Sequence, residues 1–76
     1  SEDPSRSIEA YDHLARSAVG EGDFGGAAGW IEAARVRWDH AARALTPEGE
    51  RARRALMRMG ALVELRLAIF EREAER

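Results

Sequence analysis

Two short stretches of the sequence place a histidine directly after an aspartate, a combination that could ligate a metal ion or act as a general base. They are Asp12-His13 and Asp39-His40, and imidazole and carboxylate groups serve in both kinds of chemistry. Adjacent residues of an α-helix point about 100° apart, however, so neither pair places its two side chains on one face. The spacing therefore predicts exposed histidines, with no metal site and no acid–base pair.

A glycine-rich stretch, residues 20–25, formally matches G-x-G-x-x-G, the pattern of a dinucleotide-binding loop. Such a loop connects a strand to a helix whose N-terminus holds the phosphates. Here a helical pattern precedes the glycines, and Glu21 and Asp23 would repel a phosphate. The stretch is therefore interpreted as a turn between two helices.

The sequence offers no set of residues for nucleophilic catalysis. It has no cysteine, and its serines all lie between residues 1 and 17, with no histidine–carboxylate arrangement beside them that the sequence can establish. Lysine is absent as well, which excludes a Schiff-base or phosphate-binding lysine. We therefore predict that the protein is not an enzyme, has no catalytic residue and uses no cofactor.

Composition limits the domain organisation and the kind of partner. A chain of 76 residues, 45% of them hydrophobic, suffices for one domain with a small core. No apolar run reaches the roughly 18 to 20 residues of a membrane span, and the polar first residues do not resemble a signal peptide, so a cytoplasmic protein is expected. The net charge of −2 argues against a general nucleic-acid binder, which carries an excess of basic residues.

Two prolines and the glycine-rich turn divide the chain into three predicted helices. Asp3-Pro4 and Thr46-Pro47 each place a capping side chain before a proline that can occupy the first helical position, and Asp23 is a suitable cap after the glycines. The predicted fold class is all-α, a three-helix bundle in a single domain over residues 1–76. The expected helices span about residues 4–20, 24–45 and 47–75.

Each predicted helix carries apolar residues at the 3, 4 and 7 spacings of one buried face. The residues expected to be buried are Ile8, Tyr11, Leu14, Ala15 and Ala18 on the first helix, Phe24, Ala27, Ile31, Ala34, Trp38, Ala41, Ala42 and Leu45 on the second, and Ala52, Leu56, Met59, Gly60, Val63, Leu67, Phe70 and Ala74 on the third. A further apolar flank that includes Trp30 predicts that the second helix is the central one. The third helix is the longest, so its charged end is expected to project beyond the bundle.

The first two helices carry part of a known repeat pattern. The matching residues are Glu9-Ala10-Tyr11, Leu14-Ala15, Ala18, Gly22-Asp23-Phe24, Ala27, Ile31 and Ala34. They cover about a third of the chain and resemble the tetratricopeptide repeat, a helical hairpin of roughly 34 residues. Gly25, Gly26 and Gly29 depart from that pattern, and no second repeat follows. One hairpin plus a long third helix is also similar in layout to the microtubule-interacting and trafficking (MIT) domain, and this resemblance implies that short peptides bind in grooves between the helices.

The third helix also carries apolar residues that a three-helix bundle cannot bury together with its main apolar face. Three of them, Leu62, Leu65 and Ile69, lie well round the helix from that face. They form the centre of one outer line that is basic at both ends and consists of Arg51, Arg54, Arg58, Leu62, Leu65, Ile69, Arg72 and Arg76. An exposed apolar patch of this kind is typical of an interaction surface.

We therefore expect a non-enzymatic module for protein–protein interaction or assembly. Its predicted partner-binding residues are Leu62, Leu65, Ile69, Arg58, Arg54 and Trp30, where Trp30 is either a core residue or a groove wall. The partner is a protein or peptide helix, or a second copy in a homodimer, and the sequence leaves these alternatives open. A second hypothesis is a small nucleic-acid-associated regulator that uses the basic cluster from Arg51 to Arg58, although charged runs of this type are commonly solvated faces.

Overall fold

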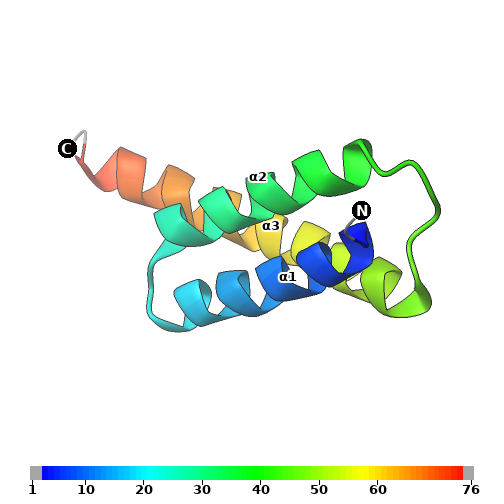
Figure 1. Ribbon diagram of the computed structural model, residues 1–76. Helices are drawn as coiled ribbons and strands as arrows, with labels where there is room; N and C mark the ends of the chain where they lie inside the picture. The colour runs from blue at the N-terminus through cyan, green and yellow to red at the C-terminus, as the bar shows by residue number, and fades with distance from the viewer. Residues whose placement is uncertain (1–2, 75–76) are drawn as a thin grey trace.

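A computed structural model describes residues 3–74, which form three α-helices packed against one another (Figure 1). The helices are α1 (Pro4–Gly20), α2 (Phe24–Asp39) and α3 (Pro47–Ala74). Figure 1 shows α2 running back along α1, and α3 returning in the direction of α1. The predicted all-α three-helix bundle is confirmed, while the predicted last residue of the third helix, residue 75, lies outside the described residues.

The two proline-containing helix starts form as predicted. The Asp3 side chain accepts a hydrogen bond of 2.9 Å from the backbone N–H of Ser5, and Pro4 opens α1. At the start of α3, the Thr46 hydroxyl accepts a bond of 3.0 Å from the N–H of Gly49. Each cap satisfies a backbone donor that has no partner within its own helix.

The glycine-rich stretch is the predicted turn between α1 and α2. Gly22 has a φ of +77°, a conformation that residues with a side chain rarely adopt. Its N–H donates to the carbonyl of Val19 at 3.0 Å, and the N–H of Asp23 donates to that of Ala18 at 2.8 Å. These two bonds form the Schellman arrangement that ends a helix. Asp23 then caps α2, because its carboxylate accepts from the N–H of Gly26 at 2.9 Å.

The substitution Asp23→Ala removes the cap of α2 and should lower the free energy of unfolding by about 1 kcal/mol, the usual cost of losing an N-cap. Asp23→Asn keeps an acceptor oxygen and should cost much less. Urea denaturation followed by circular dichroism compares the three proteins. Equal stability of wild type and Asp23→Ala would show that the bond to Gly26 does not hold α2 in place.

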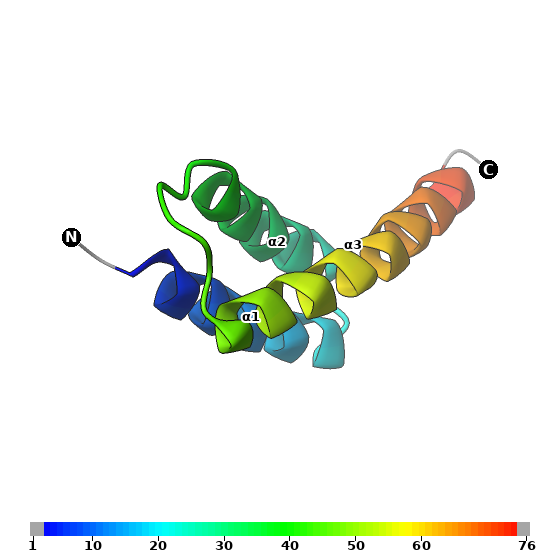
Figure 2. The same ribbon diagram turned by 90° about the vertical axis from the view of Figure 1, so that its right-hand side faces the viewer.

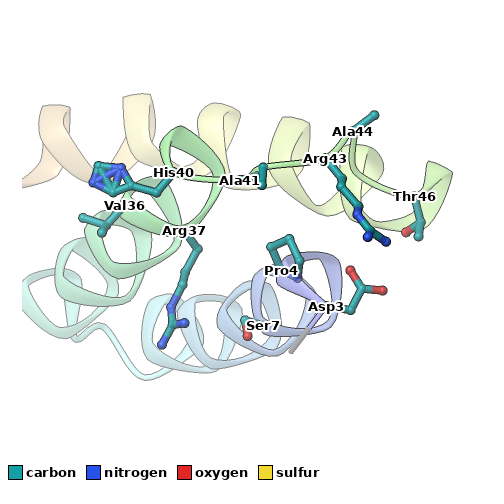
Figure 3. Close-up of a pocket in the computed structure, with 11 residues that line it drawn as sticks. Asp3, Pro4, Ser7, Val36, Arg37, His40, Ala41, Arg43, Ala44 and Thr46 are labelled. Atoms are coloured by element: carbon teal, nitrogen blue, oxygen red, sulfur yellow. The ribbon is translucent and has the colours of Figure 1, made fainter. Parts of the chain in front are cut away.

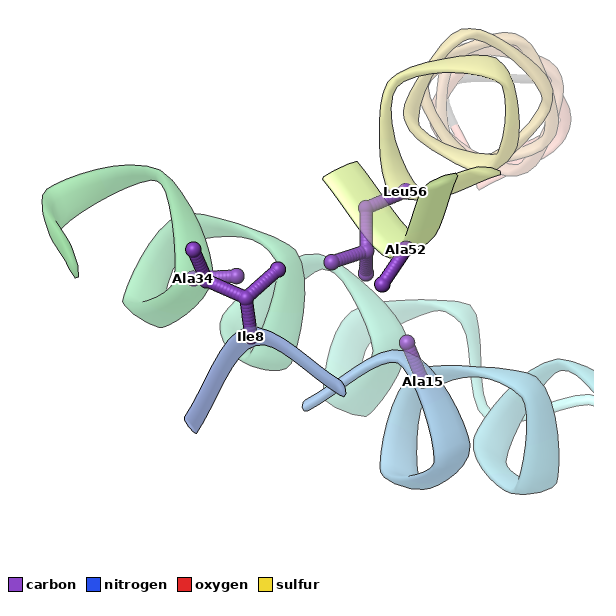
Figure 4. Packing of buried hydrophobic residues seen from close by; sticks show 5 residues of the cluster. All are labelled: Ile8, Ala15, Ala34, Ala52 and Leu56. Carbon is purple, nitrogen blue, oxygen red and sulfur yellow. The ribbon is translucent and has the colours of Figure 1, made fainter. Parts of the chain in front are cut away.

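The core is built mainly from alanine. Of the eight buried hydrophobic residues among residues 3–74, five are alanines, and the larger ones are Ile8, Leu56 and Val63. Figure 4 shows Leu56 of α3 directed toward Ile8 of α1 and Ala34 of α2. The small side chains bring the helices close together, but they bury little apolar area, so the net stability of the fold is expected to be modest.

The buried face of α1 includes two polar residues and leaves out one residue that was predicted to be in the core. Ser5 and Asp12 are buried, whereas Leu14, which was expected to be buried, is 42% exposed. The Ser5 hydroxyl accepts from the N–H of Thr46 at 2.9 Å, and Asp12 pairs with Arg16 at 3.0 Å. Because these partners satisfy the polar groups, α1 can turn its Ser5 and Asp12 side toward α3, and Leu14 is left outside.

The second helix is shorter than predicted: it ends at Asp39, not near residue 45. The expected helical residues Ala41, Ala42 and Leu45 belong to the connection to α3. Leu45 packs against the core cluster, and the N–H of the next residue, Thr46, donates to Ser5 of α1. If residues 40–45 continued α2, the chain would extend about 9 Å further along the helix axis, and Leu45 and Thr46 could not make these contacts. The tertiary contacts therefore outweigh the helix propensity of the alanines.

The packing order of the helices also differs from the prediction. The α1–α2 interface is the most extensive and the α2–α3 interface the least, so α1, not α2, makes the largest share of the contacts. The C-terminal part of α3 projects past the α1–α2 turn (Figure 1), and the second view shows it diverging sideways from α1 and α2 (Figure 2). Phe70 still reaches Phe24 at a ring-centroid distance of 6.0 Å, but it is half exposed, and Ala74 is exposed, so the predicted burial of both is wrong.

Candidate interaction surface

The outer face of α3 carries three large apolar side chains in contact with solvent. Leu62, Leu65 and Ile69 are 43%, 59% and 41% exposed. They lie roughly 140° around the helix from the buried residues Leu56 and Val63, as the helical rotation of each residue requires. We call these three residues the apolar stripe.

The apolar stripe belongs to a wider excess of exposed apolar groups. Among residues 3–74, eight large hydrophobic residues expose between 38% and 59% of their surface, and only three large hydrophobic residues are buried in the core. Five of the eight belong to α3, namely Met57, Leu62, Leu65, Ile69 and Phe70. A surface this apolar on one helix marks a contact site better than scattered apolar residues do.

The arginines of the basic cluster at the start of α3 lie in two different environments. Arg53 is turned toward the bundle: it pairs with Glu50 at 3.3 Å and its guanidinium lies 5.7 Å from the centre of the Trp38 ring. Arg51 borders a hollow of about 340 Å³ that also has Glu9, Asp12 and Glu48 on its walls. Hence these two arginines lie beside carboxylates or rings of the protein itself.

Arg54 and Arg58 are exposed on the same outer side of α3 as the apolar stripe. The ion pairs formed among residues 3–74 involve Arg16, Arg35 and Arg53, so neither Arg54 nor Arg58 has a carboxylate partner in the described chain. At the other end of the stripe, Arg72 is exposed as well. Arg76, the last predicted member of this line, lies outside the described residues.

Trp30 does not lie with the other five predicted binding residues. Its ring stacks on Tyr11 of α1, with a centroid distance of 5.9 Å and an angle of 29° between the ring planes. It is 38% exposed and therefore forms part of the α1–α2 seam, whereas the apolar stripe faces away from both helices. The structure brings together Arg54, Arg58, Leu62, Leu65 and Ile69.

A second concave region was not predicted from the sequence. An open cavity of about 990 Å³ lies between the start of α1, the end of α2 and the connection to α3 (Figure 3). Figure 3 shows Arg37 of α2 reaching toward Ser7 of α1, while Val36 and His40 lie at the end of α2. The cavity exists because α2 ends early. Only the Thr46-Pro47 helix start hinted at a connection here, and it did not locate the end of α2.

In the part of the chain that the structure describes, the histidines and carboxylates do not form a cluster that could bind a metal ion. His13 and His40 are exposed, and the buried neighbour of His13, Asp12, is bound to Arg16. Within residues 3–74, no three histidine, aspartate or glutamate side chains lie close enough to hold a metal ion. Glu32 raises the pKa of Arg35, first by accepting its hydrogen bond and then by its charge. This effect keeps Arg35 protonated and prepares no group for catalysis.

No stretch of helix within residues 3–74 combines the length and the apolar character that crossing a membrane requires. Comparison with protein-family models, with curated proteins and with solved structures found no match to the chain.

Proposed function

We propose that this protein is a non-enzymatic interaction module whose binding surface is the outer face of α3. The observation that supports this most directly is the apolar stripe, in which Leu62, Leu65 and Ile69 each expose two fifths or more of their surface while facing away from α1 and α2. Covering these side chains removes apolar area from water, which is the main driving force of protein association. The function proposed is therefore to bind a helical segment of another protein or to assemble with a second copy.

The α1–α2 hairpin serves in this proposal as the support for α3. Ala15, Ala18, Ala27 and Ala34 are fully or almost fully buried where α1 and α2 meet, which is compatible with the close packing of a tetratricopeptide-like hairpin. With α3 added, the three-helix layout is compatible with the MIT-like arrangement that the sequence suggests, but it is not specific to that family. The proposed site differs from the grooves that this resemblance implies, because it lies on the exposed side of the third helix.

The substitution Leu65→Arg tests this function. Leu65 is the most exposed residue of the apolar stripe, so the charge should cost the fold little, whereas it would be buried without a partner in a complex. Association should weaken by roughly tenfold or more, as for a central residue of an interface. Sedimentation equilibrium, with the chain alone and with a labelled amphipathic helical peptide of neutral ends, measures association. Helicity and thermal unfolding should change little.

Val36→Arg is the matched control, because Val36 is also half exposed but lies on α2. It should leave association unchanged. If wild type associates neither with itself nor with any amphipathic helical peptide, whatever the charge at its ends, or if Leu65→Arg and Val36→Arg behave alike, the outer face of α3 is not the binding surface. A large loss of stability in Leu65→Arg would contradict the proposal in a different way, by making Leu65 part of the core.

A further inference from the structure

The apolar stripe has a cationic group at each of its ends. Arg54 and Arg58 precede it and Arg72 follows it, and all three are exposed. From Arg58 to Arg72 the distance along the helix is about 21 Å, since each residue rises 1.5 Å. Among the acidic residues of α3 in this region, Glu64 and Glu71 lie well round the helix from the stripe, whereas Glu73 lies nearer to it, next to Arg72, so the excess of positive charge is greatest at the end with Arg54 and Arg58.

A second copy is a poor occupant for this surface. In an antiparallel pair with Leu65 at the centre, Arg58 of one copy faces Arg72 of the other, at both ends of the interface. In a parallel pair each arginine faces its own equivalent. Either arrangement places like charges together, which costs free energy in an interface and lowers the rate of association.

We infer that the partner is an amphipathic helix of another protein, with apolar residues at its centre and acidic residues at both ends, about 14 residues apart. Its apolar residues cover Leu62, Leu65 and Ile69, and its carboxylates pair with Arg58 and Arg72, and with Arg54. Arginine suits this role because its planar guanidinium pairs with a carboxylate through two hydrogen bonds. This inference rests on the proposed function and adds the chemistry of the partner.

Two synthetic peptides test the inference. Both are 21-residue helices with leucine at the central contact positions; one carries glutamate and the other lysine at two positions 14 residues apart. Fluorescence anisotropy with the labelled peptides should show that the glutamate peptide binds roughly tenfold more tightly at low salt. The difference should shrink at high salt, because exposed charges are screened.

The double substitution Arg58→Glu with Arg72→Glu should reverse the preference, so that the lysine peptide binds more tightly. The double substitution Arg6→Glu with Arg43→Glu changes the net charge by the same amount at exposed positions on α1 and in the connection to α3. This variant should still bind the glutamate peptide more tightly than the lysine peptide, as wild type does. Reversal in both double variants would mean that net charge alone decides binding, which would overturn the inference.

The remaining outcomes separate the inference from the proposed function. Equal binding of both peptides, lost in Leu65→Arg, would overturn the acidic-partner inference and leave the binding face intact. A stable homodimer that neither peptide dissociates would also overturn it, in favour of a second copy. Failure of both peptides and of self-association would overturn the inference and the proposed function together. Tighter binding of a DNA duplex than of the glutamate peptide would overturn the inference in favour of a nucleic-acid partner.

Discussion

The substitution Leu56→Ala should leave a large fraction of the protein unfolded at room temperature. Leu56 is fully buried and packs in one cluster with Ile8, Ala15, Ala34 and Ala52 (Figure 4). Replacing a buried leucine by alanine costs about 2–5 kcal/mol. A single core of this size supplies a net stability of only about 3–5 kcal/mol, so the loss is of the same order as the whole.

Leu65→Ala is the control for this prediction, because it makes the same chemical change on the outer face of the same helix. Its cost should be about 0.5 kcal/mol or less, as for an exposed position. Urea denaturation curves of the two variants and wild type, recorded by circular dichroism, measure the difference. Similar losses in both variants would mean that Leu65 is part of the core, which would contradict the assignment of the outer face as a binding surface.

The substitution Gly49→Ala should also destabilise the protein, although alanine is the better helix former. A Cβ atom at Gly49 would lie 2.6 Å from the Ser5 hydroxyl oxygen and 3.1 Å from the Ser5 Cα. Since the Cα cannot rotate away, α1 and α3 have to separate there, and the bond from Thr46 to the Ser5 hydroxyl is disturbed. Overpacking of this kind costs about 1–3 kcal/mol, more than the gain in helix propensity of up to about 1 kcal/mol.

The substitution Gly29→Ala should have the opposite effect on stability from Gly49→Ala. Apart from the neighbouring backbone of α2 itself, no atom lies within 4 Å of a Cβ at this exposed position, so the substitution should stabilise the protein by up to about 1 kcal/mol. Thermal and urea unfolding measure the free energy of unfolding of both variants. This free energy should fall in Gly49→Ala and rise in Gly29→Ala. If Gly49→Ala stabilised the protein as Gly29→Ala does, α1 and α3 would not approach each other closely at Ser5.

The starts of the helices were predictable because local chemistry determines them. Asp3, Asp23 and Thr46 each cap a helix through a bond to a backbone N–H two or three residues away. The end of α2 was not predictable in this way. It depends on Leu45 packing into the core and on Thr46 meeting Ser5, contacts between residues far apart in the sequence. The alanine-rich residues 41–45 would otherwise favour continued helix.

The candidate surface likewise combines features that follow from the local sequence with features that depend on contacts between distant residues. The positions of Leu62, Leu65 and Ile69 follow from helical periodicity, because a helix that buries Leu56 and Val63 must turn these three away. The orientations of Trp30 and Arg53 depend on neighbouring residues that helical periodicity does not identify. Trp30 stacks on Tyr11, and Arg53 turns toward Glu50 and Trp38. The cavity near Val36 escaped prediction because it exists only where α2 ends early.

The most direct test of the binding surface is to map it by NMR. Backbone amide shifts of the isotopically labelled protein are followed while the unlabelled glutamate-ended peptide is added. The account predicts that the shifts concentrate on residues 54–72 of α3, strongest around Leu65, and that the cavity residues Val36, Arg37 and His40 change little. Shifts concentrated at that cavity, with α3 unaffected, would contradict it.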